Sequence, residues 1–381
     1  MFFVLLIPAL LLIVYCGIIV LYTKWFRRLK PFTGIASEDS CFFSVIIPAR
    51  DEEANIANCL LSILNNHYDK NLLEIIVIDD HSTDNTAKII TGLQQQHDCI
   101  KLIAMKDLVS PEEKINSYKK LAIQKAIALS KGDWIITTDA DCMVPGNWLK
   151  NFNAFIRETN AVFVAAPVRF INSGRFLSIF QCLDFLSLQG ITAASVSAGF
   201  HSMCNGANLS YKKSVFFEVD GFKGFEHLAS GDDMFLMRKI QKLYPDRTRY
   251  IFSQDSIVST LPMPTVKTFI NQRIRWASKA DSYDDKKVIA VLFVVYFFNL
   301  SFLFLLIAGC LNPVYFVWLL VFMAAKIAFE MNFMRYVCRF FGQEAILKYF
   351  PLMQPFHIAY TLISGWLGKF GTYQWKGRQV N

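Results

Sequence analysis

The chain has 381 residues and a net charge of +8 at pH 7, from 39 Lys and Arg against 31 Asp and Glu. Hydrophobic residues make up 54% of it and charged residues only 18%, and the mean hydropathy is +0.32. These values exclude collagen-like and disordered chains and do not fit a wholly soluble protein. Because the excess cations flank apolar runs, a membrane surface is favoured over nucleic acid as the partner.

The first predicted element is an apolar helix. Residues 2–22 carry no charge, and a helix of that length rises about 30 Å, the thickness of the hydrocarbon core. The flank directly after it is basic, with Lys24, Arg27, Arg28 and Lys30. We therefore predict an N-terminal transmembrane anchor over 1–23 with a cytoplasmic C-terminal end, and a basic linker over 24–41. A cleaved signal peptide is the alternative, but no basic stretch precedes the run and no small-residue cleavage site follows it.

The next segment alternates strand and helix patterns. Buried strands are expected at 42–49, 73–80, 99–105 and 134–138. Amphipathic helices are expected at 52–66, 84–96, 117–130, 148–158, 176–189, 233–243 and 266–282. This order predicts an α/β domain with a mostly parallel sheet covered on both faces, which binds ligands beyond the carboxyl ends of its strands. We place this domain, cytoplasmic and catalytic, at 42–285.

The C-terminal region, 286–381, is apolar again. Residues 288–325 carry no charge and are interrupted by Asn312-Pro313, which predicts a helical hairpin with spans near 288–310 and 313–330. Basic residues on both sides place the open ends of the hairpin in the cytoplasm: Lys286, Lys287, Lys326, Arg335 and Arg339.

A last apolar stretch near 350–368 contains Gln354, Pro355 and His357, and is weak as a span. A third span of the C-terminal region and a re-entrant or interfacial segment are equally compatible with it, and a short basic tail follows. The sequence therefore predicts a multi-pass protein of the cell (inner) membrane.

Acidic residues follow two predicted strands. Asp79 and Asp80 end the second strand, and Asp139 and Asp141 follow the fourth. Both pairs lie where a parallel sheet presents its ligands, and two carboxylates on a strand-end loop can hold Mg²⁺ or Mn²⁺ together with substrate phosphates. The alternative is local: Asp79 and Asp80 as turn residues, and Asp84 as the N-cap of the next helix.

Two further groups stand out later in the chain. Asp232 and Asp233 open a helical pattern, where capping and the helix dipole offer a local explanation. Gln272 and Trp276 share a helix face, with Arg275 beside them, and a juxtamembrane helix with an interfacial tryptophan is the local alternative. The nine cysteines form no Cys-x-x-Cys pair and the six histidines no helical pair, so any metal site would use carboxylates.

Taken in order, these motifs carry a family resemblance. They are Ser44-Val-Ile-Ile-Pro-Ala-Arg-Asp-Glu-Glu, Ile78-Asp79-Asp80, Asp139-Ala-Asp141, Cys204-Asn-Gly-Ala-Asn208, Gly231-Asp232-Asp233 and Gln272-Arg-Ile-Arg275-Trp276. Over 42–276 the chain resembles the membrane-associated family 2 glycosyltransferases, which include cellulose, hyaluronan and poly-N-acetylglucosamine synthases and lipid glycosyltransferases. The resemblance implies a GT-A (nucleotide-diphospho-sugar transferase) fold and inverting sugar transfer from a nucleotide donor, usually a UDP-sugar.

The resemblance also implies roles for individual residues. The nucleotide-sugar would be bound by Pro48, Ala49, Glu52, Asp79, Asp80, Lys119 and Asp139. Asp141, with Asp139, would ligate a divalent cation on the diphosphate. Asp233, with Asp232 beside it, matches the general base for the acceptor hydroxyl. Gln272, Arg275 and Trp276 match a motif that places arginine toward the diphosphate and tryptophan beneath the acceptor.

We therefore predict a metal-dependent inverting hexosyltransferase, using Mg²⁺ or Mn²⁺, that moves sugar to a lipid-linked or membrane-held acceptor at the cytoplasmic face. A processive synthase of a β-linked glycan is the alternative, because the Gln-x-x-Arg-Trp motif is typical of it, yet so few spans enclose no channel without an oligomer or export partner. A non-catalytic scaffold that binds nucleotide-sugar is more remote, since it leaves Asp233 and Trp276 unexplained. Nucleic acid is not an expected partner.

Overall fold

The structure is a computed structural model, and it describes residues 2–34, 38, 40–108, 117–201, 203–226, 228, 231–279, 282, 285–371, 373–375 and 378–380. The chain forms two compact units. The sheet unit comprises Lys30–Ile171 and Ser202–Leu261, and the helical unit comprises Met1–Leu29, Asn172–His201 and Pro262–Asn381. Each unit is built from segments distant in sequence.

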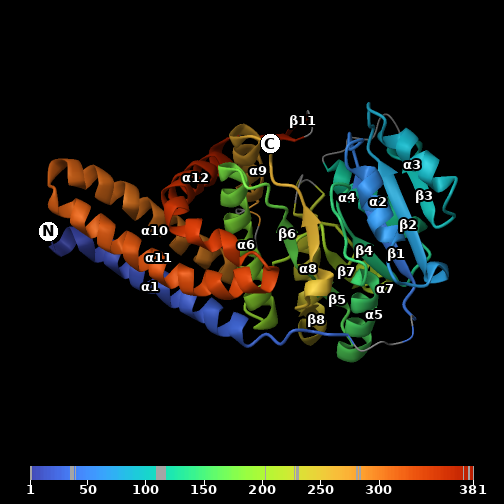
Figure 1. The fold of residues 1–381 in the computed structure, drawn as a ribbon, viewed down its shortest axis with the longest axis horizontal. Coiled ribbons are helices and arrows are strands. Elements are labelled where there is room, and N and C mark those ends of the chain that lie inside the picture. Colours follow the sequence, from blue (N-terminus) through green and yellow to red (C-terminus); the bar gives the residue numbers. More distant parts are fainter. Residues whose placement is uncertain are drawn as a thin grey trace. The chain divides into compact units, whose positions relative to one another are not determined.

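The sheet unit is built on a seven-stranded sheet with the order β3-β2-β1-β4-β7-β5-β8 (Figure 1). Its strands are β1 (Phe43–Ala49), β2 (Leu73–Asp79), β3 (Ile100–Ala104), β4 (Trp134–Thr137), β5 (Phe163–Ala165), β7 (Leu209–Lys212) and β8 (Thr248–Tyr250). Only β7 runs antiparallel to its neighbours, β4 and β5, and the other pairs of this sheet are parallel. The predicted mostly parallel α/β sheet is therefore confirmed. A separate parallel pair joins β6 (Val168–Phe170) and β9 (Val258–Thr260).

Six α-helices of the described residues belong to this unit: α2 (Ile56–Leu64), α3 (Thr86–Gln94), α4 (Tyr118–Leu129), α5 (Trp148–Thr159), α7 (Lys213–Glu218) and α8 (Asp232–Leu243). Every residue of β2 is buried, and so are all of β1 except Pro48, because helices cover both faces of the sheet. The chain-order predictions thus match the observed elements from β1 to α5, with ends shifted by a few residues.

One polar contact fixes the end of the sheet opposite the strand-end loops. The buried carboxylate of Glu74 accepts hydrogen bonds from the Ser44 hydroxyl at 2.5 Å, the Lys131 N–H and the Lys101 ammonium at 2.8 Å. Burial alone would raise the pKa of Glu74, but these hydrogen bonds hold it below its ordinary value. Glu74 therefore ties β1, β2 and β3 to the turn before β4.

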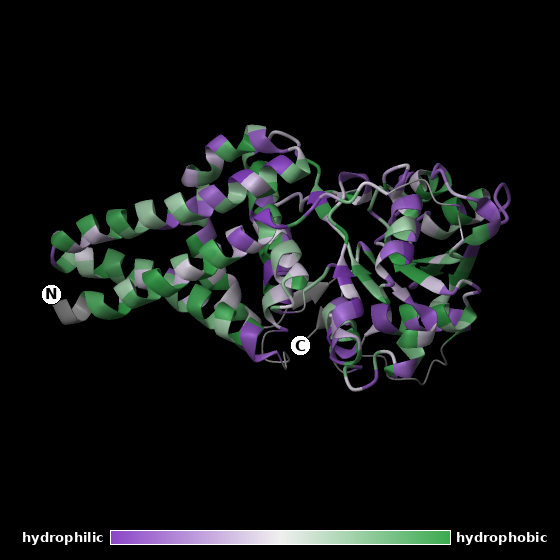
Figure 2. Ribbon diagram, turned by 90° about the horizontal axis from the view of Figure 1, so that it is seen from below, coloured by the Kyte–Doolittle hydropathy of each residue, from purple (hydrophilic) through white to green (hydrophobic). Residues whose placement is uncertain are grey.

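The helical unit contains α1 (Phe2–Arg27), α6 (Phe176–Ser197), α9 (Val266–Ala277), α10 (Lys286–Leu311), α11 (Val314–Phe341) and α12 (Phe350–Phe370), and the short strands β10 (Tyr373–Trp375) and β11 (Arg378–Val380). Among the described residues, four helices are long and apolar enough to cross a membrane: Leu5–Arg27, Phe176–Ser197, Lys286–Leu311 and Val314–Phe341. In Figure 2, hydrophobic residues predominate along the long helices near the N-terminus. The predicted helical hairpin is present, since α10 and α11 meet at Asn312-Pro313.

The helical unit differs from expectation in three places. The helix predicted at 176–189 extends to Ser197, which makes α6 a candidate span. The apolar stretch near 350–368 forms α12, which is not among the four candidates in the described part of the chain. The helix predicted at 266–282 ends at Ala277 as α9, and residues 280 and 281 lie outside the described residues. The boundary at 285 stays a prediction, while α6 and α9 pack in the helical unit.

Buried ionic contacts join these helices. On α11, Lys326 is fully buried and donates to Glu330 at 2.7 Å and to Gln354 of α12 at 2.5 Å, while Tyr15 of α1 donates to Glu330. Lys326, which the sequence placed on a cytoplasmic flank, is thus an interior residue of α11. Charges in apolar surroundings require such pairing.

Candidate functional site

The strand ends bring the first predicted residues to one edge of the sheet. In the parallel pairing of β1 and β2, Pro48 lies opposite Ile78 and Ala49 opposite Asp79. The register continues one residue further, because the Asp80 N–H donates to the Ala49 carbonyl at 2.8 Å. On the other side of β1, the Thr138 N–H donates to the Ile46 carbonyl at 3.3 Å, so Asp139 follows β4 at the same edge.

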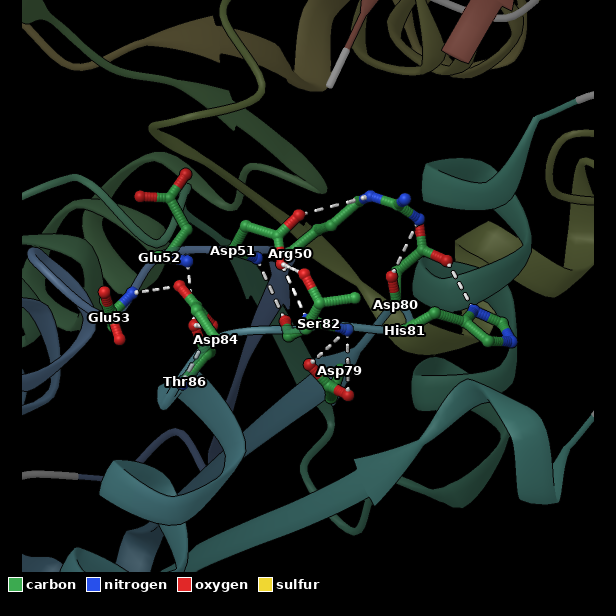
Figure 3. A network of polar contacts seen from close by, with 11 residues as sticks. Arg50, Asp51, Glu52, Glu53, Asp79, Asp80, His81, Ser82, Asp84 and Thr86 are labelled. Carbon is green, nitrogen blue, oxygen red and sulfur yellow. Dashed lines mark hydrogen bonds and ion pairs between the residues drawn. The ribbon is translucent and has the colours of Figure 1, made fainter. Parts of the chain in front are cut away.

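The loops after β1 and β2 are joined by reciprocal hydrogen bonds (Figure 3). The Asp51 N–H donates to Ser82, and the Asp51 carboxylate accepts from the Thr83 N–H at 2.8 Å. Asp51 and His81 have positive φ values, of 48° and 58°, which non-glycine residues seldom adopt. The crossed bonds hold both residues in this conformation and give the edge a fixed shape.

Asp84 has a wider role than the predicted N-cap. The N-cap of α3 is Asn85, and the Asp84 carboxylate accepts from the N–H of Thr86, the first residue of α3, at 2.9 Å. Its second oxygen accepts the Glu53 N–H at 3.0 Å. Although burial would raise the pKa of Asp84, these bonds lower it. The N-cap prediction is therefore wrong by one position, and Asp84 connects the two loops instead.

Arg50 and His81 were not singled out from the sequence, yet both contact Asp80. Arg50 donates to the Asp80 carbonyl at 3.1 Å, and its Nη1 lies 3.9 Å from the carboxylate. His81 Nδ1 lies 3.0 Å from Asp80 Oδ1 (Figure 3). In the described part of the chain, the Asp79 carboxylate, in contrast, accepts only the Ser82 N–H, which is shared between Oδ1 at 3.3 Å and Oδ2 at 3.4 Å. Asp79 therefore retains acceptor capacity for a ligand donor.

A second acidic group surrounds the end of β4. Lys119, at the start of α4, donates to Asp139 at 2.6 Å. Burial raises the pKa of Asp141 to about 6, with further contributions from the charges of Asp139 and Glu52. Three carboxylates therefore repel one another at this edge.

A divalent cation fits this environment because it would relieve that repulsion. In the described residues no group of three or more His, Cys, Asp and Glu side chains is arranged to hold a metal by itself. A cation at Asp139 and Asp141 would therefore take further oxygen ligands from outside the protein, as Mg²⁺ does with substrate phosphates.

Asp233, the predicted general base, and its neighbour Asp232 lie at the start of α8. Asp233 accepts one hydrogen bond on each carboxylate oxygen, from the Gly206 N–H and the Met234 N–H, both at 2.8 Å. A Cβ built on Gly206 would lie 3.6 Å from Asp233 Oδ2 and 3.8 Å from Asp232 Oδ2, so both carboxylates lie beside this glycine. Each oxygen keeps lone pairs for a further donor.

Lys119 interacts both with Asp139, after β4, and with the charges of Asp232 and Asp233. Burial alone would lower the pKa of Lys119, but the negative charges of Asp139, Asp232 and Asp233 raise it above its ordinary value. One ammonium therefore lies in the field of both acidic groups. The predicted residues at the ends of β1, β2 and β4 share an edge, and Lys119, which bonds Asp139, also feels the charges of Asp232 and Asp233 at the start of α8.

Gln272, Arg275 and Trp276 lie on α9, in the helical unit. Arg273, which follows Gln272, is buried and was not singled out from the sequence. Its guanidinium pairs with Asp184 of α6 through Nε at 3.0 Å and Nη2 at 2.6 Å, and it donates to Gln272 at 2.7 Å. It also stacks 4.2 Å from the centroid of the Trp276 ring. Arg273 thus fixes the orientation of two of the three motif side chains.

Two family models match the chain. "Glycosyl transferase family 2" matches residues 44–216, and "Glycosyl transferase family group 2" matches residues 134–364, more than half of the 381 residues. Together these matches include all of the predicted site residues.

Among the curated relatives, the "Probable glycosyltransferase YdaM" of Bacillus subtilis is 26% identical over 296 residues, 74% of this chain and 65% of that protein. The "Poly-beta-1,6-N-acetyl-D-glucosamine synthase" of Staphylococcus epidermidis is 24% identical over 239 residues, 61% of this chain and 53% of that protein. The chain thus spans less than two thirds of the length of these relatives.

A similar solved structure is the mannosyltransferase PcManGT from Pyrobaculum calidifontis, in complex with GDP-Man and Mn²⁺. The TM-score is 0.60 at 18% identity, and the alignment covers 96% of this chain and 98% of that one. The likeness shows a common fold, and together with the family match it confirms the predicted GT-A fold.

Proposed function

The chain belongs to glycosyl transferase family group 2, and we propose on this basis that it transfers a sugar from a nucleotide-sugar donor, a UDP-sugar, to a lipid-linked or membrane-held acceptor with inversion at the anomeric carbon. The membership agrees with the resemblance found in the motifs. One observation supports the proposal above all others: Lys119 bonds Asp139 while the charges of Asp232 and Asp233 act on it.

In this proposal, the nucleotide-sugar donor binds at the edge of the sheet where the parallel strands end. The resemblance assigns the nucleoside to Pro48, Ala49, Glu52, Asp79 and Asp80, and the open acceptor capacity of Asp79 suits the N–H or O–H donors of a nucleoside. Lys119 and Asp139 take the sugar diphosphate. A Mg²⁺ or Mn²⁺ ion, when held by Asp141 and Asp139, would stabilise the negative charge of the leaving diphosphate. PcManGT, whose structure contains Mn²⁺ and GDP-Man, shares the fold.

Asp233 is the proposed base. Its two backbone hydrogen bonds fix the carboxylate, and each oxygen keeps a lone pair for the acceptor hydroxyl. Asp233 takes the hydroxyl proton as the acceptor oxygen bonds to the anomeric carbon and the bond from that carbon to the diphosphate oxygen breaks. A positioned carboxylate in this role contributes roughly 10² to 10⁴ in rate. Asp232, one residue earlier, supports the negative potential around Lys119.

The four candidate spans found among the described residues support a membrane-held acceptor. α9, with the Gln272–Trp276 motif, ends at Ala277, shortly before the candidate span α10 begins at Lys286. We propose that this motif serves the acceptor, as the resemblance implies, and that it does so near the lipid at the cytoplasmic face of the inner membrane, as the basic flanks of the apolar segments indicate. These roles rest on the motif.

The test uses membranes that contain the full chain, with UDP-glucose, UDP-N-acetylglucosamine, UDP-galactose or GDP-mannose as donor and release of the nucleoside diphosphate as readout. Asp233→Asn should lower turnover at least 100-fold and keep UDP binding, because the amide accepts no proton. Asp246→Asn, an exposed carboxylate in the same unit, is the matched control. Asp141→Ala should weaken donor binding only when Mg²⁺ or Mn²⁺ is present. Unchanged turnover in Asp233→Asn contradicts the base assignment.

A processive synthase remains the second candidate, because the poly-N-acetylglucosamine synthase of Staphylococcus epidermidis aligns with 61% of this chain. Sizing of the labelled product separates the two candidates. A ladder of lengths indicates polymerisation, and a single lipid-extractable species indicates one transfer.

A further inference from the structure

Gly206, whose backbone N–H bonds Asp233, is itself bonded by β4, the strand that precedes Asp139 and Asp141. Thr137 is the last residue of β4, is 5% exposed, and donates its hydroxyl to the Gly206 carbonyl at 2.8 Å. The N–H of the same Gly206 donates to Asp233 Oδ2, also at 2.8 Å. A chain of two hydrogen bonds thus leads from β4 through one glycine to the proposed base.

The direction of β7 makes this connection possible. β7 runs antiparallel to β4, with Thr137 opposite Leu209, so the residues before β7 return to the edge where β4 ends. Asn208 anchors one end of that turn by donating to the Pro167 and Ser256 carbonyls, both at 2.7 Å. Gly206 is held only by Thr137 and Asp233 among the bonds of the described residues, apart from its chain neighbours.

We propose that Thr137 is a positioning residue for the transfer reaction, which sets the place of the Asp233 carboxylate through Gly206. The proposal rests on the function proposed above. Thr137 touches no reacting atom. Without its hydroxyl, the part-buried Gly206 carbonyl loses this bond, and the Gly206 N–H shifts with it relative to Asp233. Misplacement of a reacting group by about 1 Å can cost about 100-fold in rate.

The chain supplies a matched control in the next residue. Thr138 is fully buried, and its hydroxyl has no hydrogen-bond partner in the part of the chain that the structure describes. Valine has the shape of threonine and suits a strand or strand end equally well. Thr137→Val removes a hydroxyl that bonds, and Thr138→Val removes one that does not.

The experiment measures nucleoside diphosphate release by membranes containing the full chain, with the four donors named above. Thr137→Val should lower kcat about 10-fold with the donor KM within twofold of wild type, Thr138→Val should match wild type, and Thr137→Ser should recover most of the rate. In an Asp233→Asn background, Thr137→Val should lower the residual rate by less than twofold, because its effect passes through the base.

Other outcomes overturn the proposal. Equal rates in Thr137→Val and Thr138→Val do so, and so does an equal loss in both the wild-type and the Asp233→Asn backgrounds, which indicates a structural role. If Thr137→Val does not bind UDP, Thr137→Ala and Thr137→Ser take its place, and equal rates in those two also overturn it. If the wild-type chain is inactive with every donor, the proposed function is contradicted instead. The two failures are distinguishable, because this one is seen in the wild type and does not depend on any variant.

Discussion

Lys120 offers a sharp test of how the segment before the base is held. It is 3% exposed and follows Lys119 on α4. Its ammonium donates to the Phe225 carbonyl at 2.8 Å and to the Leu228 carbonyl at 2.7 Å. Phe225 in turn stacks on Phe235 of α8, with ring centroids 4.4 Å apart. The perturbation is Lys120→Met, which keeps the apolar stem and removes the donors.

The expected loss of local stability follows from the two hydrogen bonds that Lys120 donates. Hydrogen bonds to a charged group contribute about 1.5–3 kcal/mol each, so their loss costs up to roughly 6 kcal/mol. Methionine offsets part of this loss, because it removes the cost of burying an ammonium and leaves carbonyls that water can reach. We expect a net loss of about 2 kcal/mol in local stability, which corresponds to about 30-fold faster opening of this segment.

Hydrogen exchange measured by mass spectrometry on the full chain reports this opening. Amides of 221–226 should exchange about 30-fold faster in Lys120→Met, including Gly221 and Phe225, whose N–H groups bond Phe216 and Phe222. Amides of β2 should not change. Lys125→Met, at a partly exposed position of the same helix, is the control. If exchange of 221–226 changes by less than threefold, or equally in both variants, the two carbonyl bonds do not stabilise the segment.

Three other predictions concern the stability of each unit and the membrane topology. Glu74→Gln should destabilise β1 at pH 7 by about 2 kcal/mol, measured by hydrogen exchange. Because the folded pKa of Glu74 is lowered, its contribution is complete above the unfolded pKa of about 4.3 and is lost as pH falls through the folded value, so variant and wild type should converge at lower pH. Asp184→Asn should cost about 3–5 kcal/mol by leaving buried Arg273 unpaired, and should lower the temperature at which the helical unit loses trypsin resistance; replacing both residues by Leu and Met should recover most of it. A membrane-impermeant maleimide should label the exposed Cys310 in intact cells and the half-buried Cys99 only after permeabilisation, and the reverse pattern contradicts the proposed topology.

The first half of the sheet unit could be predicted because each element is long enough to show its period. β1 and β2 are seven-residue apolar runs, and α4 and α5 each have twelve residues. β5, β6, β8 and β9 have only three residues each, and such short strands show no alternation. They were missed because their pairing is set by tertiary contacts and not by local pattern.

The helix predicted at 176–189 was placed in the catalytic domain, whereas α6 extends to Ser197 and belongs to the helical unit. Its polar residues Gln181 and Asp184 are buried and bonded, to Met263 and Arg273. A polar residue with an internal partner is indistinguishable in sequence from one that faces water. The same ambiguity placed Lys326 on a cytoplasmic flank when its partner Glu330 was only four residues away.

In the candidate site, too, some residues could be placed from local sequence patterns and others only from the strand topology. Asp79, Asp139 and Asp141 could be placed at one edge because parallel strands present their carboxyl ends together. Gly206 could not, since its place depends on the reversed direction of β7, which a four-residue strand does not reveal. That reversal has a chemical consequence. The residues before β7 arrive at the edge where β4 ends, because the two strands run in opposite directions. The Gly206 N–H therefore reaches Asp233 next to the strand that Asp139 follows, so the proposed base and the proposed donor site share one support.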